Sequence, residues 1–136
     1  MEKILDFLKK NKVMTIATCA DNKPRASIME YYVVNDSIVF ATSPSSIKSE
    51  NLKENDRISV SVYAMPQFVT LDGSVTEPSP AEIKEFTDIL QTNHPEFKEL
   101  VEKGMLEPFV YYKVVIDTAY YNDFSKGMTP AEIFKA

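Results

Sequence analysis

Two strand-like runs, Arg25 to Val34 and Ser37 to Thr42, are separated only by Asn35 and Asp36. Both runs are rich in β-branched and aromatic residues, and neither contains Gly or Pro. Asn and Asp tolerate the positive φ angles that a two-residue hairpin turn requires. The pattern therefore predicts an antiparallel β-hairpin, and it favours an antiparallel sheet over a parallel one.

The first of these runs has no clearly polar side. Alternation along a strand sends successive side chains to opposite faces. One face carries Arg25, Ser27, Met29, Tyr31 and Val33, and the other carries Ala26, Ile28, Glu30, Tyr32 and Val34. Because both faces are largely apolar, we expect this strand to form a barrel wall whose outer face is also covered, by a second subunit.

Other segments have the patterns of strands and helices. Strands are expected over residues 13–20, 57–64, 68–76 and 109–122. Helices are expected over residues 2–10, from Ser46, from Pro80 to Thr92, from Pro95 to Gly104, and briefly after Thr129. Gly73 should mark a bulge or a close backbone approach. The predicted fold is mainly β: about six antiparallel strands in a barrel with flanking helices, as one domain over residues 1–136.

Composition excludes several classes of partner. With 136 residues, 44% of them hydrophobic, the chain can bury a core without disulfides or a structural metal. Its net charge of −5 opposes the phosphate-neutralising surface that nucleic-acid binding needs. The N-terminus is charged and amphipathic, unlike a signal peptide, and no apolar run approaches the roughly 20 residues of a membrane span. We expect a soluble, cytoplasmic protein with no nucleic-acid or membrane partner.

The inventory of reactive side chains is small. With one His and one Cys, the chain cannot gather the usual ligands of a zinc site, and a catalytic triad could use only His94. His94 directly precedes Pro95 at an expected helix start, so we expect it to be a solvent-facing cap or junction residue. No pair of acids stands out. We therefore assign no catalytic residue and no metal ligand.

A cofactor could supply the chemistry that the side chains lack, and one stretch could hold a phosphate. The helix that starts near Ser46 presents free N–H groups and partial positive charge, and Lys48 adds a full charge in its first turn. Arg25 offers a planar fork of donors from the neighbouring strand. The other interpretation is that Arg25 and Lys48 are ordinary surface residues of a charged protein, and spacing alone leaves both open.

The order and spacing of several segments resemble a known family. They are an N-terminal helix, the strand ATCADNKPRASIM, the hairpin strand SIVFATS, the turn and helix SPSSIKSENLKEN, and the strands RISVSV and LDGSV. Together, over residues 2 to about 76, they resemble the pyridoxamine 5′-phosphate oxidase-like FMN-binding split barrels. The resemblance implies a split β-barrel that binds FMN as a homodimer, with the flavin at the subunit interface.

The resemblance also implies which residues bind the cofactor. In that family the FMN phosphate is held by an Arg at the start of the second strand and by a Ser and a Lys at the helix start. Residues after the Arg border the flavin ring, and a further hydroxyl lies near the ribityl phosphate. The implied cofactor-binding residues are Arg25, Ala26, Ser27, Ile28, Thr42, Ser46 and Lys48.

The chain departs from the pyridoxamine phosphate oxidases themselves in its substrate residues. Glu30 stands where those enzymes carry a Lys that helps to bind the substrate phosphate, and a carboxylate there would repel a phosphate. Their C-terminal Arg and His are absent, since nothing after residue 108 contains either. We therefore expect an FMN-dependent oxidoreductase that acts on an unknown small molecule and is not a true pyridoxamine phosphate oxidase. The alternatives are a non-catalytic flavin-binding module and a relative that binds haem or a deazaflavin.

Overall fold

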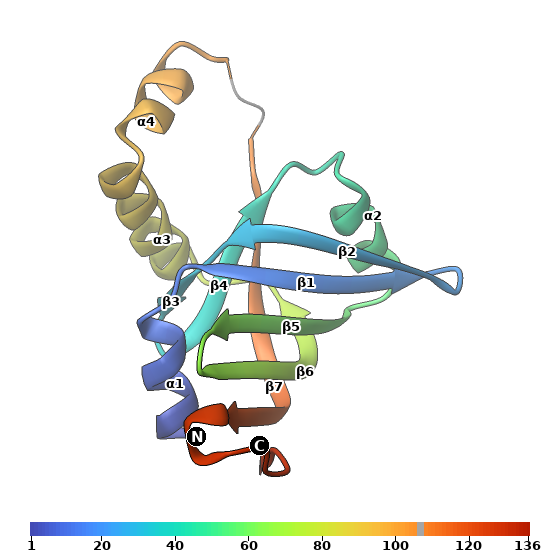
Figure 1. The fold of residues 1–136 in the computed structure, drawn as a ribbon. Coiled ribbons are helices and arrows are strands. Elements are labelled where there is room, and N and C mark those ends of the chain that lie inside the picture. The colour runs from blue at the N-terminus through green and yellow to red at the C-terminus, as the bar shows by residue number, and fades with distance from the viewer. Residues whose placement is uncertain (106–107) are drawn as a thin grey trace.

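A curled antiparallel sheet organises the protein. The computed structural model describes residues 1–105 and 108–136, and in this part of the chain eight strands form one sheet in the order β2-β1-β5-β6-β7-β4-β3, with β8 paired to β7 (Figure 1). The strands are β1 (Val13–Ala20), β2 (Lys23–Glu30), β3 (Tyr32–Val34), β4 (Ser37–Thr42), β5 (Arg57–Ala64), β6 (Gln67–Thr76), β7 (Val110–Asp123) and β8 (Glu132–Lys135). The helices are α1 (Glu2–Lys9), α2 (Ile47–Glu54), α3 (Pro80–Asn93) and α4 (Pro95–Glu102), with a 3-10 turn η1 (Phe124–Lys126). The mainly β split barrel predicted from the sequence is confirmed.

The hairpin at Asn35 and Asp36 is also confirmed. Both residues have positive φ angles, 51° and 59°, and β3 and β4 pair directly across them. The run that precedes the hairpin is not one continuous strand, however, and that part of the prediction is wrong. It divides at Tyr31 into β2, which pairs with β1 at one edge of the sheet, and β3, which lies at the other edge.

Tyr31 is the point at which the chain passes from one edge of the sheet to the other. Its side chain is fully buried, and its hydroxyl donates to the carbonyl oxygen of Leu8 at 2.8 Å. Its backbone N–H donates to the carbonyl oxygen of Lys12, also at 2.8 Å, instead of to a neighbouring strand. The crossing is therefore anchored to α1 and to the turn that follows it. Because β2 and β3 are not paired in the described sheet, the barrel is split between them.

Helix α1 packs its apolar side on the core of the half-barrel, as the amphipathic pattern over residues 2–10 predicted. Ile4, Phe7 and Leu8 are buried there, and Phe7 meets the ring of Tyr121 on β7 edge to face. Lys3 forms an ion pair with Glu132 of β8 at 3.0 Å, so the two ends of the chain lie together. None of the helices in the described ranges is long and apolar enough to cross a membrane.

The outer face of β3 and β4 is covered by a helix of the same chain. Phe86 of α3 packs with Tyr32, Val34 and Val39 in a second apolar cluster, separate from the core inside the half-barrel. Helix α3 starts with a capping box, in which the Ser79 hydroxyl accepts from the Glu82 N–H and the Glu82 carboxylate accepts from the Ser79 N–H. The expectation that a second subunit covers the whole of this wall is therefore wrong for its β3 half, which α3 covers.

Gly73 lies at a bulge, as predicted. The pairing of β6 with β7 shifts register between Asp72 and Gly73, which leaves Asp117 of β7 without a partner in this ladder. A Cβ atom at position 73 would press against the backbone carbonyl of Val115. The residue lacks a side chain because the β7 backbone occupies that space.

The short terminal helix predicted after Thr129 does not form, and residues Glu132–Lys135 form β8 instead. β4 pairs with β7 only at residues 110–113. Residues 118–121 of β7 therefore have room for another strand on the side away from β6. β8 takes this place, and Phe134 packs against the core. Tertiary pairing thus outweighs the local capping signal. The division at Tyr31 and the added β8 explain why the described chain has eight strands where about six were predicted.

Candidate functional site

Helix α2 begins after the serine-rich turn, and Ser46 is its N-cap. Ser46 Oγ accepts a hydrogen bond from the Ser49 N–H at 3.3 Å, and the hydroxyl of Thr42, the last residue of β4, donates to the same oxygen at 3.3 Å. The backbone N–H groups of Ile47 and Lys48 have no acceptor among the residues that the structure describes. The helix N-terminus therefore offers two free donors and its partial positive charge to an anion.

Two amide side chains hold α2 against the β1–β2 hairpin. Asn51 donates to the Thr18 hydroxyl at 3.1 Å, and Asn55 donates to the carbonyl oxygen of Cys19 at 2.9 Å. Arg25 lies opposite Thr18 in the register of β1 and β2. These contacts therefore place Arg25 on the strand that borders the helix.

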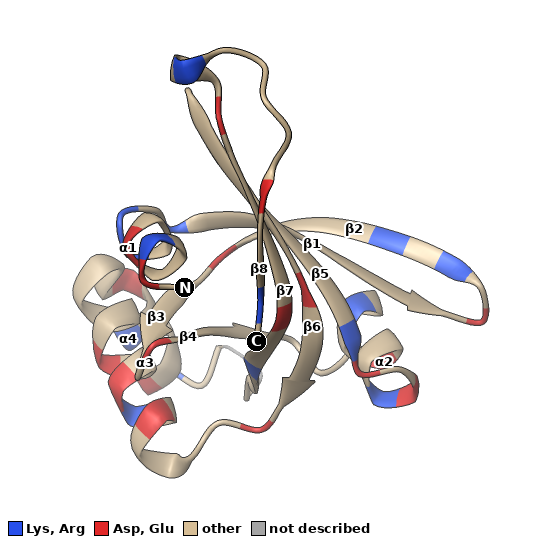
Figure 2. Cartoon of the chain, turned by 90° about the horizontal axis from the view of Figure 1, so that it is seen from below, with Lys and Arg blue, Asp and Glu red and all other residues tan. Residues whose placement is uncertain are grey.

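A groove of about 370 Å³ lies between the hairpin and α2. Arg25 lines it together with Ile47, Glu50, Asn51 and Glu54 of the helix. Figure 2 shows basic positions on the part of β2 that approaches its turn with β1, and both signs of charge on α2. Neither Arg25 nor Lys48 forms an ion pair within residues 1–105 and 108–136. Both cations are therefore available to a bound anion.

The predicted phosphate-binding residues all lie on or beside α2, but they do not all contact one another. Thr42 and Ser46 are hydrogen-bonded to each other at the helix start. Arg25 faces the side of α2 that carries Ile47, whereas Lys48 is half-buried one position further round the first turn and does not line the groove. An anion at the start of α2 would have Lys48 in the same turn of the helix and Arg25 on the strand across the groove.

The residues predicted to border a flavin ring lie along β2, an edge strand of the sheet. Ala26 and Ile28 are exposed, and Ser27 is half-buried. The Ile28 side chain is 76% exposed, an unusual state for a large apolar residue in a strand. An edge strand also leaves one row of backbone N–H and C=O groups free for a ligand or a second chain.

This donor set fits the phosphate group of a flavin mononucleotide. It combines two free backbone N–H groups at a helix start, the ammonium group of Lys48 and the guanidinium group of Arg25. Groups of these kinds bind phosphate dianions in many proteins. Glu50 and Glu54 further along the groove oppose an anion, so they favour the N-terminal end of α2 over its middle.

Two tyrosines of β7, Tyr112 and Tyr121, pack in the core of the half-barrel. Tyr112 stacks on Phe40 with ring centroids 5.2 Å apart, and its hydroxyl lies 2.7 Å from Ser49 Oγ. Tyr121 is buried against Phe7. These residues are part of the core, which is why a run of aromatic residues in a strand does not by itself indicate a cofactor site.

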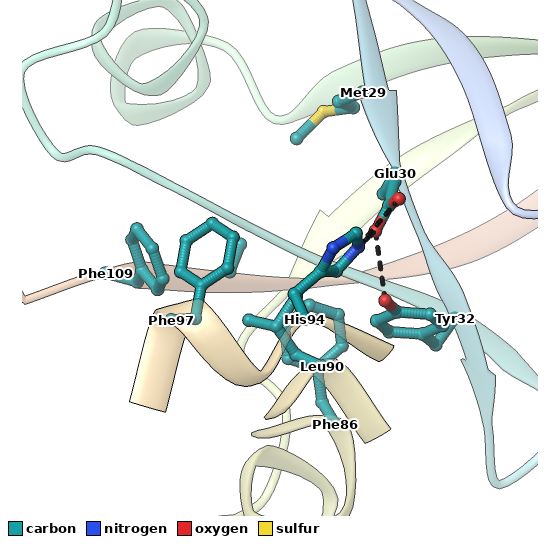
Figure 3. A pocket seen from close by; sticks show the side chains of 9 residues that line it. Met29, Glu30, Tyr32, Phe86, Leu90, His94, Phe97 and Phe109 are labelled. Atoms are coloured by element: carbon teal, nitrogen blue, oxygen red, sulfur yellow. Dashed lines mark hydrogen bonds and ion pairs between the residues drawn. The ribbon is translucent and has the colours of Figure 1, made fainter. Parts of the chain in front are cut away.

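A second cavity, of about 280 Å³, lies between β3, β4 and the junction of α3 and α4 (Figure 3). Its walls are mainly apolar, and its polar groups are Glu30, Tyr32 and His94. Nε2 of His94 lies 2.9 and 3.0 Å from the two carboxylate oxygens of Glu30, and the Tyr32 hydroxyl donates to one of them at 3.0 Å. The sequence does not reveal this cluster, because no spacing signal joins Glu30 to a residue 64 positions away.

His94 is a junction residue, as predicted, and its side chain is partly exposed to solvent and partly buried. It joins α3 to α4, makes no side-chain capping bond, and keeps only 31% of its side chain exposed because it pairs with Glu30. The hydrogen bond to Glu30 raises the pKa of the imidazole above its ordinary value, and the charges of Glu30 and Glu96 act in the same direction, while partial burial opposes them. His94 therefore holds a proton at higher pH than a free histidine.

This pairing should be visible as a pH dependence. Since the folded-state pKa of His94 is raised, the stabilisation from the pair is fully present below the unfolded pKa and is lost as pH rises through the folded pKa. An NMR titration of the imidazole Cε1–H should give a pKa above that of a free histidine, and the assignment is direct because the chain has one His. Glu30→Gln should lower that pKa, whereas Glu102→Gln, on the exposed part of α4, should not. An unshifted wild-type pKa would contradict the pairing.

Comparison with known proteins gives the family. The family model for pyridoxamine 5′-phosphate oxidase matches residues 1–123, and no curated protein matches the chain significantly. A haem-binding protein from Mycobacterium smegmatis shares the fold, with a TM-score of 0.72 and 18% identity over 92% of this chain and 53% of that one. A NimC/NimA family protein from Clostridium acetobutylicum also shares the fold, with a TM-score of 0.73 and 19% identity over 100% of this chain and 92% of that one. An FAD-binding protein from Mesorhizobium loti does so with a TM-score of 0.70 and 18% identity over 88% of this chain and 90% of that one.

These structural neighbours show the fold alone at such low identity, and the chain spans about half the length of the haem-binding protein. The match to the family model shows more than the fold, because it runs over residues 1–123. These residues include all strands from β1 to β7 and both sides of the groove at α2. The chain therefore belongs to the pyridoxamine 5′-phosphate oxidase family.

Proposed function

We propose that the protein is a homodimeric flavoprotein that binds FMN and uses it to oxidise or reduce a small molecule. One observation carries the proposal: the start of α2 offers two free N–H groups and Lys48, beside a strand that offers Arg25, and neither cation has an ion-pair partner in the described chain. Family membership and an FAD-binding structural neighbour support a flavin as the ligand.

The phosphate contacts supply much of the expected affinity. A charge-assisted hydrogen bond contributes about 1.5–3 kcal/mol to the free energy of binding. The contact from Arg25 should lie in the lower part of this range, because the exposed side chain is screened by solvent. Lys48 is half-buried and lies beside the free N–H groups, so its contact should be the stronger one. Ser46 and Thr42 hold the turn in place through their hydroxyl groups.

The flavin ring would lie along β2, at the backbone of Ala26, Ser27 and Ile28. Edge-strand N–H and C=O groups can bond to the polar edge of the ring, and Ile28 can cover an apolar face. The bound flavin supplies the hydride or electron transfer, so the protein needs few acid or base groups of its own. The role of the chain is to hold the phosphate, orient the ring and exclude water.

The substrate is not pyridoxamine 5′-phosphate in this proposal. Glu30 stands where the substrate phosphate would need a cation, and its carboxylate is already paired with His94 and Tyr32. A phosphate-free small molecule fits these charges better.

Comparing FMN with riboflavin tests the proposal, because the two differ only in the phosphate. FMN should bind at least about 100-fold more tightly, which corresponds to two modest charge-assisted contacts. Quenching of flavin fluorescence measures both affinities in one titration format. Equal affinity for the two flavins, or no binding of FMN, would contradict the proposed phosphate site.

The proposed dimer is tested at Ile28. In the flavin-free protein, Ile28→Glu should convert the dimer to a monomer, because it places a charge at an apolar residue that is 76% exposed on an edge strand and would face the partner. Ile133→Glu on β8, also at an exposed isoleucine, is the matched control and should leave the dimer intact. Sedimentation velocity measures both. A wild-type protein that sediments as a monomer with FMN bound would show that the site needs no second subunit.

A further inference from the structure

The cavity between the sheet and the α3–α4 junction has a wall of aromatic rings. Tyr32 packs against Phe86 with centroids 5.2 Å apart, and Phe97 stands 5.9 Å from the His94 ring and 6.2 Å from Phe109. Figure 3 shows these rings around one space, with Glu30 bonded to His94 and Tyr32 at one end and Met29 at the side. A volume of about 280 Å³ is at the lower end of ligand pockets and suits a molecule with one ring.

Acids outnumber bases around the polar side of the cavity, where Glu30 lines the space and Glu96 lies behind His94. Glu30 faces Nε2 of His94, and Glu96 lies 3.4 Å from the other ring nitrogen, so two carboxylates share one imidazole. The Glu30 side chain is 38% exposed, which leaves part of its carboxylate open to the cavity. Among the described residues that line the cavity, no Lys or Arg balances this charge.

We propose that this cavity binds a small organic cation: one apolar ring that carries a single ammonium group, with Glu30 as its counter-ion and the aromatic side chains as its cage. The cavity shares no lining residue with the groove at α2, so this proposal does not depend on a bound flavin.

Two independent features select a cation over other ligands. The faces of aromatic rings attract positive charge, and the attraction grows when the ligand leaves water. The carboxylate of Glu30 can accept a hydrogen bond from an ammonium group in addition to those from Tyr32 and His94, because a carboxylate has about four acceptor positions. An anion would meet the same carboxylate, whose cationic neighbour His94 is shared with Glu96.

NMR titration with three small probes tests the proposal on the whole chain. Benzylamine, benzyl alcohol and benzoate share the ring and differ in charge, and at about pH 7.5 the amine is protonated. The reporters are the single imidazole, that of His94, and the methyl group of Met29, which lies across the cavity. Benzylamine should shift both signals saturably and bind at least about tenfold more tightly than benzoate, a difference of about 1.4 kcal/mol.

Variants separate the counter-ion from the cage. Glu30→Gln should remove the preference for the amine, Ala41→Leu should fill the cavity and weaken all three probes while leaving Glu30 in place, and Glu102→Gln should change nothing. Thermal unfolding of each variant shows that the fold is retained. Benzoate binding as tightly as the amine, no saturable shift with any probe, or an amine preference that survives Glu30→Gln would overturn the proposal.

Discussion

Replacing Lys48 with Ala should weaken FMN binding by about 10- to 100-fold, the equivalent of one charge-assisted hydrogen bond to the phosphate. The reason is local: Lys48 is half-buried in the first turn of α2, next to backbone N–H groups that have no acceptor in the described chain. Arg25→Ala should have a smaller effect in the same direction, because the exposed guanidinium is better screened. Fluorescence titration of each variant with FMN and with riboflavin measures the effect.

A matched control distinguishes the phosphate contact from general charge. Lys53 is an exposed lysine in the last turn of the same helix, so Lys53→Ala changes the net charge equally without touching the proposed site. We expect it to bind FMN as the wild type does. Riboflavin affinity should be the same in all of these proteins, since riboflavin has no phosphate to lose contacts with. A loss of riboflavin binding in Lys48→Ala would show that the variant acts through the fold.

Gly73→Ala should lower the free energy of unfolding by at least about 2 kcal/mol, within the range for forcing extra atoms into a packed site. The added methyl group would press on the Val115 carbonyl of β7, which is backbone and cannot rotate away. The bulge at Asp72 and Gly73 fixes this close approach, so relief requires β6 and β7 to separate. Urea denaturation measures the change.

Ser74→Ala, at the next position of β6, is the control for Gly73. It removes a hydroxyl from a half-buried residue and adds no atom near β7, so its effect should stay within about 0.5 kcal/mol. Equal stability of Gly73→Ala and wild type would mean that β7 has more freedom at the bulge than the structure shows.

The elements that were predicted correctly depend on neighbours in the sequence. The turn at Asn35 and Asp36 needs two residues that accept positive φ, and the start of α3 needs a Ser and a Glu three positions apart. Such signals act over a single turn. They are therefore readable without knowing where the rest of the chain lies.

The errors arise where distant segments decide the outcome. Tyr31 interrupts a run with strand composition because its backbone bonds to Lys12 and its hydroxyl to Leu8. The residues after Thr129 have a helix-start pattern but pair with the open edge of β7. Neither partner can be recognised from local spacing.

In the candidate site, too, some residues could be placed from their sequence neighbours, and others depend on distant segments. Ser46 and Lys48 could be placed on the first turn of α2 from the sequence, and the structure confirms the Ser46 cap. The position of Arg25 beside that helix depends on the pairing of β1 with β2 and on the bond from Asn51 to Thr18. The pairing of Glu30 with His94 depends on the packing of α3 against β3, so it could not be predicted.

The most direct test of FMN binding is to identify what the protein carries. The chain is purified without added cofactor, its visible absorbance is recorded, and the small molecules released on denaturation are identified by mass spectrometry. A second sample is incubated with FMN, freed of excess FMN and measured in the same way. We predict the absorbance bands of a bound flavin and FMN as the released molecule, in up to one copy per chain. Release of haem or a deazaflavin, or the absence of any flavin after incubation with FMN, would contradict the proposed function.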